Sequence, residues 1–298
     1  MKLLRTVMLL TVLTLIFCRP VFAQIVSHIL YTDKNYDISG VVTLQNSPEK
    51  MEFLVVHDSK FPWQSRVSLV TVRNDTASAV HLFWPDGFSK LIDLESVSRC
   101  PDDSTFITMT SRGHGLLFRL SEDHHSLEGI LEFNLPRGDF GRRQIEGFAT
   151  ARLGGTVYAF WSDRGHNDRP ATVWWGLMDM ATGAITIQDS VQISVPWPVK
   201  NTVRHISELR VDPTGGLWIS AVRDGGNHGP FEGALYMAGN FRPENNSELA
   251  FASEKPPLCL LRVHGHKVEA FDFVHDFKNG VVLGTDDEKY GSILIQNW

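Results

Sequence analysis

The sequence predicts an all-β protein, a five-bladed β-propeller whose last blade is closed by the N-terminal strand. Three observations support this fold class. A strand-start signature recurs five times, a second apolar strand follows it after a turn, and the last repeat lacks one strand. A repeat of about 50–60 residues with four strands in each unit is typical of propeller blades.

The signature consists of a polar residue, an apolar residue, Ser or Glu, any residue, and a second apolar residue. Its centres lie 56, 51, 61 and 62 residues apart. A β-sandwich is the rival architecture, but a sandwich gives no reason for a recurring first-strand signature. The five segments are 37–41, 93–97, 144–148, 205–209 and 267–271.

Turn residues separate each signature from a second apolar strand, as hairpins require. We expect these second strands over 53–57, 106–111, 157–162, 217–222 and 281–285. Third and fourth strands are readable over 173–179 with 185–193, and over 234–237 with 258–263.

The fifth repeat offers only three strands, at 267–274, 281–285 and 292–298, before the chain stops. A surplus strand is available at 25–31. Pairing it with the last repeat would complete the fifth blade and cover two sheet edges. We therefore expect one propeller domain over 24–298.

Residues 1–23 have the pattern of a secretory signal peptide: Lys2 and Arg5, an apolar run over 7–17, and a small residue at Ala23. The apolar run is too short to span a bilayer. We expect a secreted or periplasmic protein with no membrane span. Only Cys100 and Cys259 would remain after cleavage, in different blades, and we expect both thiols to be free.

The net charge argues against nucleic acid as a partner. Lys2, Arg5 and Arg19 are the only charged residues of the leader, so the remaining chain has 28 − 3 = 25 basic and 34 acidic side chains. A nucleic-acid-binding protein needs a basic face. We expect a monomer with a small-molecule ligand.

The topology predicts a ring of oxygen ligands in the central channel, because the first strand of each blade lines it. Three carboxylates in a narrow channel repel one another, and a divalent cation relieves the repulsion. Oxygen ligands alone favour one Ca²⁺, with Mg²⁺ as the rival ion. The alternative is that the glutamates are only solvated at the channel mouth. The predicted metal ligands are Ser39, Glu95, Glu146, Ser207 and Glu269.

The loops after the second strands gather around the same mouth and are rich in ionisable groups. Mixed arginines and acids at one opening suit an anionic, phosphate-bearing ligand. In a hydrolase, arginines would neutralise developing charge and an aspartate would orient the attacking water. These candidate catalytic residues are Arg112, Arg164, Arg223, Asp58, Asp163 and Asp286.

The order Ser, Glu, Glu, Ser, Glu around five blades resembles the calcium site of the soluble calcium-activated nucleotidases, the apyrase family of five-bladed propellers. The segments 39–41 and 55–58 are similar to the first blade of that family. The segments 93–97 and 111–113 also resemble phytase-like esterase and SdiA-regulated propellers. The resemblance implies a calcium-dependent hydrolase of nucleotides. The alternative is a non-catalytic binding platform with a structural calcium.

Overall fold

The computed structural model describes residues 25–31, 36–47, 49–74, 76–136, 144–199, 201–244, 247–274 and 280–297. The proposed leader, 1–23, lies outside these residues. Within the described ranges, no helix has the length and apolar character needed to cross a membrane.

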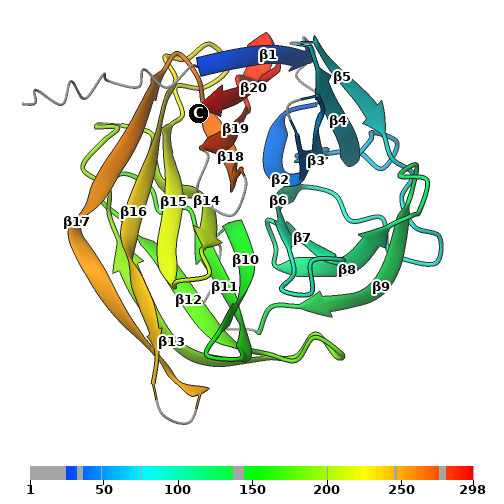
Figure 1. Cartoon of the computed structure of the whole chain (residues 1–298). Helices are drawn as coiled ribbons and strands as arrows, with labels where there is room; N and C mark the ends of the chain where they lie inside the picture. The colour runs from blue at the N-terminus through cyan, green and yellow to red at the C-terminus, as the bar shows by residue number, and fades with distance from the viewer. Residues whose placement is uncertain are drawn as a thin grey trace, which may run out of the picture.

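Five antiparallel four-stranded sheets surround a central channel, as the sequence predicts (Figure 1). Blade one comprises β2(Ile38–Asn46), β3(Met51–His57), β4(Val67–Arg73) and β5(Thr76–His81). Blade two comprises β6(Leu94–Arg99), β7(Phe106–Thr110), β8(His114–Leu120) and β9(Leu127–Asn134). Blade three comprises β10(Ile145–Leu153), β11(Thr156–Asp163), β12(Ala171–Met178) and β13(Ile185–Ile193). Blade four comprises β14(Val203–Val211), β15(Gly216–Arg223), β16(Glu232–Pro243) and β17(Leu249–His264).

The N-terminal strand closes the fifth blade. This sheet has the order β1–β20–β19–β18, with β1(Ile25–Tyr31) antiparallel to β20(Ser292–Asn297). The other two strands are β18(Val268–Phe273) and β19(Val281–Thr285). The structure therefore confirms the prediction that the strand at 25–31 completes the fifth blade.

The apolar core is divided among the blades. Five buried clusters each fill the space between two neighbouring sheets, and together they occupy all five interfaces. Tyr236 and Phe160, for example, pack between blades three and four. Each sheet thus buries both faces, which explains why its middle strands are almost wholly apolar.

The five inner strands pack closely around the channel, and small residues follow the Ser/Glu position where they meet. A Cβ at Gly40 would lie 2.6 Å from the backbone nitrogen of Val97, and one at Gly147 would lie 2.8 Å from that of Leu209. The Ser96 hydroxyl donates to the Phe148 carbonyl at 3.0 Å, which ties blade two to blade three.

The largest difference from the predicted strands lies in the fourth blade. Strands β16 and β17 have 12 and 16 residues, whereas the sequence pattern predicts four and six. Met237 pairs with Leu258 and Gly239 pairs with Ser253, so the polar segment that contains Glu254 and Lys255 has no register partner in β16 and forms a bulge between two paired parts of β17. Cys100 and Cys259 are both free, as expected.

Candidate functional site

The five predicted ring residues all lie at irregularities of the pairing between the first and second strands. The register skips Ser39, Glu95, Glu146 and Glu269, and in blade four it skips the stretch that contains Ser207. A β-bulge leaves its extra residue unpaired and re-aims its side chain. The recurring Ser or Glu is therefore the bulged residue of each blade, which explains why the signature repeats.

Arg204 supplies positive charge to this ring. Its guanidinium lies 2.9 Å from Glu269 Oε1, 2.7 Å from Asp224 Oδ2 and 4.0 Å from Glu146 Oε2. Burial alone would lower the pKa of Arg204, but the carboxylates of Glu269, Glu146 and Asp224 raise it above its ordinary value. The guanidinium therefore stays charged between blades three and five.

Lys267 is the second cation of the mouth and is only 1% exposed. Its Nζ contacts the carboxylates of Asp286, Glu288 at 2.9 Å and Glu269 at 3.4 Å. Burial opposes its charge, yet Glu269 and Asp286 raise the pKa of Lys267. A buried lysine needs such partners, and it holds the first and second strands of blade five together at the mouth.

The ring glutamates of blades two and three retain protons more strongly than exposed carboxyl groups. Burial, then the neighbouring Glu146 and Asp58, raise the pKa of Glu95 well above its ordinary value. Burial also raises the pKa of Glu146 to about 7, although Arg204 and Arg164 oppose the shift. Carboxyl groups of this kind can donate a proton near neutral pH.

A compact acidic cluster connects blades one and two beside Glu95. Oxygen atoms of Asp58, Asp93 and Glu95 all lie within 4.8 Å of one another. Lys60 contacts both aspartates, with Nζ 2.5 Å from Asp58 Oδ1. Burial raises the pKa of Asp58 to about 7. Burial would raise the pKa of Asp93 too, but hydrogen bonds from Asp58, Lys60 and Ser111 lower it.

Asp93 has a backbone conformation that is uncommon for a residue with a side chain, with φ at 65°. Its amide donates to Ser59, its carbonyl accepts from Ser111, and its carboxylate accepts from the Ser111 hydroxyl. These contacts favour the ionised form of Asp93 beside two carboxyl groups whose pKa is raised. Strained backbone held by its surroundings is a frequent property of functional sites.

The predicted catalytic residues lie in different environments. Asp58 belongs to the acidic cluster, and Asp286 is buried against Lys267. Arg164 lies 3.6 Å from Glu146 at the mouth. Arg112 is exposed, and Arg223 lies 3.6 Å from Glu232.

Asp163 contributes to the structure of its loop. It is fully buried, and its carboxylate accepts from the backbone of Gly165 and Thr172 and from Arg169. Those contacts fix the turn that carries Arg164, and they leave the carboxylate remote from solvent.

The two serines of the ring also differ. The Ser207 hydroxyl donates to the Val268 carbonyl at 2.9 Å and lies 2.9 Å from Ser220 Oγ, so it joins blades four and five. The Ser39 hydroxyl is buried and has no hydrogen-bond partner among the described residues. A cation bound by all five ring residues would have to displace Arg204 and the Ser207 contacts, and a cation bound by the acidic cluster would have to displace Lys60 from Asp58 and Asp93.

Sequence reasoning missed Asp93, Arg204 and Lys267. Asp93 and Lys267 occupy the polar first position of the repeat, two residues before the ring position. That position was visible in the signature and lies at the same mouth. Arg204 lies one residue earlier and aligns with no recurring position, so its contacts depend on the bulge of β14.

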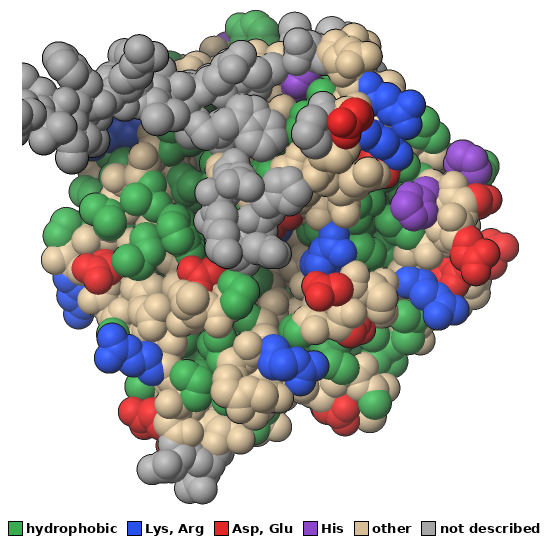
Figure 2. Space-filling model, in the orientation of Figure 1, with side chains coloured by type: hydrophobic (Ala, Val, Ile, Leu, Met, Phe, Trp, Pro, Cys, Tyr) green, Lys and Arg blue, Asp and Glu red, His purple; other side chains and the backbone are tan. Residues whose placement is uncertain are grey.

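Charged side chains of both signs alternate on the face shown in Figure 2. Asp, Glu, Lys and Arg are interspersed with apolar side chains, and the described part of this face presents no continuous basic patch.

Comparison with solved structures supports the five-bladed class. The endo-arabinase of Bacteroides thetaiotaomicron is similar with a TM-score of 0.52 and 6% identity, over 91% of this chain and 97% of that one. The catalytic domain of a Coprinopsis cinerea α-L-arabinofuranosidase gives a TM-score of 0.49 at 7% identity, over 89% and 98%. The Penicillium chrysogenum α-L-arabinanase complexed with arabinobiose gives 0.46 at 9% identity, over 92% and 97%.

No protein-family model matches the sequence, and no curated protein matches it either. The three neighbours are arabinanase-type propellers rather than apyrase-type ones. The comparison therefore supports the propeller class of the resemblance, while the nucleotidase activity stays a prediction.

Proposed function

We propose that the protein is a hydrolase that carries out acid–base catalysis at the carboxylate mouth of its channel. The observation that carries the proposal is the juxtaposition of Asp93, Glu95 and Asp58 within 4.8 Å. The pKa of Asp93 is lowered and those of Glu95 and Asp58 are raised. Carboxyl groups with opposite pKa shifts can supply an acid and a base to one reaction.

In this mechanism Glu95 is the general acid. Its buried carboxyl group keeps a proton at neutral pH and passes it to the oxygen of the leaving group. Asp93 is ionised and attacks the electrophilic carbon as the nucleophile, because its oxygen lies within 4.8 Å of Glu95 and leaves no room for a water between the two. The deprotonated Glu95 then takes a proton from the water that releases the product. Lys60 and Ser111 hold Asp93 in place, and Lys60 offsets the negative charge of the cluster.

A neutral, hydroxyl-rich substrate such as a glycoside fits this mouth better than an anion does. The cations Arg204, Lys267, Lys60 and Arg164 all contact carboxylates. An anionic substrate would have to compete with those carboxylates, whereas sugar hydroxyls can donate to them. Paired carboxylates are also the usual machinery of glycoside hydrolysis. The likeness to arabinanases concerns the fold alone.

A substrate screen tests this proposal. It would compare nitrophenyl glycosides of pentoses and hexoses with nucleoside di- and triphosphates, each with added calcium and with chelator. We expect release of nitrophenol from a glycoside that persists in chelator and is lost in Asp93→Asn. Glu122→Gln, in an exposed turn, is the matched control and keeps full activity. Turnover that Asp93→Asn leaves intact would contradict the proposal.

The second candidate is the calcium-dependent hydrolase of phosphate-bearing molecules. The compact oxygen cluster favours it, because Ca²⁺ takes six to eight oxygen ligands. Asp58, Asp93 and Glu95 would supply three, with the unpartnered Ser39 hydroxyl as a further candidate. Bound calcium would polarise a phosphoryl oxygen.

Thermal unfolding with and without calcium tests this candidate. An ion that binds only the folded state stabilises it by about 2.7 kcal/mol at a hundredfold excess over Kd. A cluster site predicts that Asp58→Asn abolishes the rise in Tm, whereas the five-residue ring predicts that Glu146→Gln does so. An unchanged parent Tm in calcium would exclude both.

A further inference from the structure

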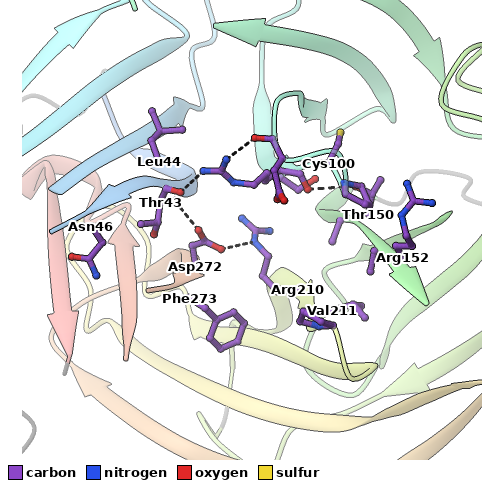
Figure 3. A pocket seen from close by; sticks show the side chains of 17 residues that line it. Thr43, Leu44, Asn46, Cys100, Thr150, Arg152, Arg210, Val211, Asp272 and Phe273 are labelled. Carbon is purple, nitrogen blue, oxygen red and sulfur yellow. Dashed lines mark hydrogen bonds and ion pairs between the residues drawn. The ribbon is translucent and has the colours of Figure 1, made fainter. Parts of the chain in front are cut away.

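A cavity of about 590 Å³ opens at the end of the channel opposite the carboxylate mouth. All five inner strands contribute their last residues to it, whereas the mouth is built from their first residues. Figure 3 shows the lining, with Asp272 between Thr43 and Arg210. Nothing in the proposed hydrolysis uses this cavity.

Arg210 closes the inner end of the cavity. Its Nη2 donates to the Val41 carbonyl at 3.0 Å and to the Val97 carbonyl at 2.7 Å, so the side chain crosses from β14 to β2 and β6. Its Nη1 donates to the Leu209 carbonyl and lies 3.0 Å from Glu208 Oε1. This layer separates the cavity from the ring of glutamates.

Polar groups near this floor are buried and lack hydrogen-bond partners among the described residues. They are the Ser98 hydroxyl, the Thr43 hydroxyl and the Nε of Arg210, which lies 3.7 Å from Asp272 Oδ1. Ser98 is 2% exposed and Arg210 is 6% exposed. Unpartnered buried donors are costly, and native structures usually satisfy them.

The charge of the lining is positive. Arg99, Arg152 and Arg210 face Asp103 and Asp272, which leaves one arginine in excess. Arg99 is already oriented, because its Nη2 donates to the Thr43 carbonyl at 2.6 Å and its Nη1 to the Asp103 carbonyl at 2.9 Å. A fixed guanidinium loses little freedom when it binds a planar anion.

Part of the remaining lining is apolar. Leu44, Val211, Pro213 and Phe273 form the walls between the polar floor and the opening. A pocket of this size, with apolar walls and a few placed polar groups, is typical of small-molecule sites.

We propose that this cavity binds a small organic monocarboxylate. The carboxylate lies over the floor, where it accepts hydrogen bonds from the Arg99 guanidinium. The apolar part of the molecule contacts Leu44 and Phe273. A monoanion matches the single excess positive charge, whereas phosphate, with a second charge, would face Asp272 unpaired.

Calorimetric titration of the parent protein with benzoate and hexanoate tests the site, with benzamide, hexanamide and inorganic phosphate alongside. We expect saturable binding of one carboxylate per chain, and binding of the matched amide at least tenfold weaker. Arg99→Gln should weaken carboxylate binding about tenfold or more, since a hydrogen bond to a charged group is worth that factor. Leu44→Glu places a carboxylate in the wall at a partly exposed position, and it should abolish binding even if Arg99→Gln folds poorly.

Two controls locate the site. Asp93→Asn, at the opposite end of the channel, and Glu122→Gln should both leave carboxylate affinity unchanged. The inference is overturned if no carboxylate saturates the protein below about 10 mM, which corresponds to less than 3 kcal/mol of binding free energy. Tighter binding of phosphate than of benzoate, or binding that depends on Asp93 and not on Arg99, also overturns it.

Discussion

The two ends of the channel are built from the same five strands but differ in charge. At the starting ends, bulges place Glu95, Glu146 and Glu269 beside Arg204 and Lys267, and the cations contact carboxylates. At the other ends the lining has an arginine in excess and buried donors without acceptors. One end therefore suits proton transfer to a neutral substrate, and the other suits the binding of an anion.

This difference indicates that the two ends of one propeller channel can serve as separate sites. The Glu208–Arg210 layer divides it, and its contacts to Val41 and Val97 bind the blades together there. The sequence interpretation placed the anionic ligand at the carboxylate mouth. We propose an anion site at the opposite end instead.

The largest expected effect is a loss of turnover at the carboxylate mouth alone. Asp93→Asn removes the ionised member of the cluster, and loss of the nucleophile should cost at least the 10²- to 10⁴-fold in turnover that loss of an acid or base costs. We expect a fall in kcat of about that size on a glycoside, with the urea midpoint nearly unchanged. Rates within twofold of the parent protein would show that the reaction does not use this cluster.

The layer between the two ends is the next target. Arg210→Met leaves the buried carbonyls of Val41, Val97 and Leu209 without donors and Glu208 without its partner. We expect a loss of about 3 kcal/mol or more in the free energy of unfolding, measured in urea. Arg119→Met is the matched control, because Arg119 pairs with Glu128 on an exposed strand face and should change stability by less than about 0.5 kcal/mol. Equal losses in the two variants would contradict a bridging role for Arg210.

The pH dependence of stability tests the protonation of Glu208 in the layer between the two ends. Burial raises the pKa of Glu208 to about 8 from its ordinary 4.5, although Arg210 opposes the shift. Between these two values the folded protein holds a proton that the unfolded chain has released, so stability falls as pH rises. In Glu208→Gln the side-chain amide is uncharged at every pH, like the protonated carboxyl group that it replaces. We expect its stability relative to the parent protein to rise across this window by up to about 1.4 kcal/mol per pH unit. A pH-independent difference would contradict a buried, protonated Glu208.

The smallest effect concerns the thiols. Cys100 borders the anion cavity but is 1% exposed, and burial raises its pKa to about 11. Cys259 lies on the partly exposed outer strand β17. Alkylation followed by peptide mapping should modify Cys259 first, and Cys100 only after unfolding. Rapid modification of native Cys100 would show that the cavity opens further than the structure indicates.

The fold was predictable because the repeat is periodic. Blade number, the order of strands and the closing role of 25–31 all follow from segments that recur at similar spacing. The length of β17 was not predictable, because its two paired parts, 249–253 and 258–264, are separated by a polar bulge that contains Glu254 and Lys255. The polar surface of an outer strand carries little periodic signal.

The site was predictable only in outline. The signature identifies Glu95, Glu146 and Glu269 as channel residues, since they occupy one position in each blade. Their charge partners depend on bulges and on contacts between blades, and single-strand patterns do not encode either. Arg210 and Asp272 share one position of the repeat, three residues after the ring residue, but the residue type at that position differs in every blade. The opposite cavity therefore gave no recurring signal in the sequence.

The pairing of β1 with β20 has a consequence for biosynthesis. The first described strand leaves the ribosome about 260 residues before its partner, and at typical elongation rates that interval lasts on the order of tens of seconds. During that time β1 presents an unpaired backbone edge to the cell, while blades one to four can already assemble behind it. A chaperone that shields extended segments would therefore matter most for these seven residues, and the fifth blade can close only after β20 has emerged.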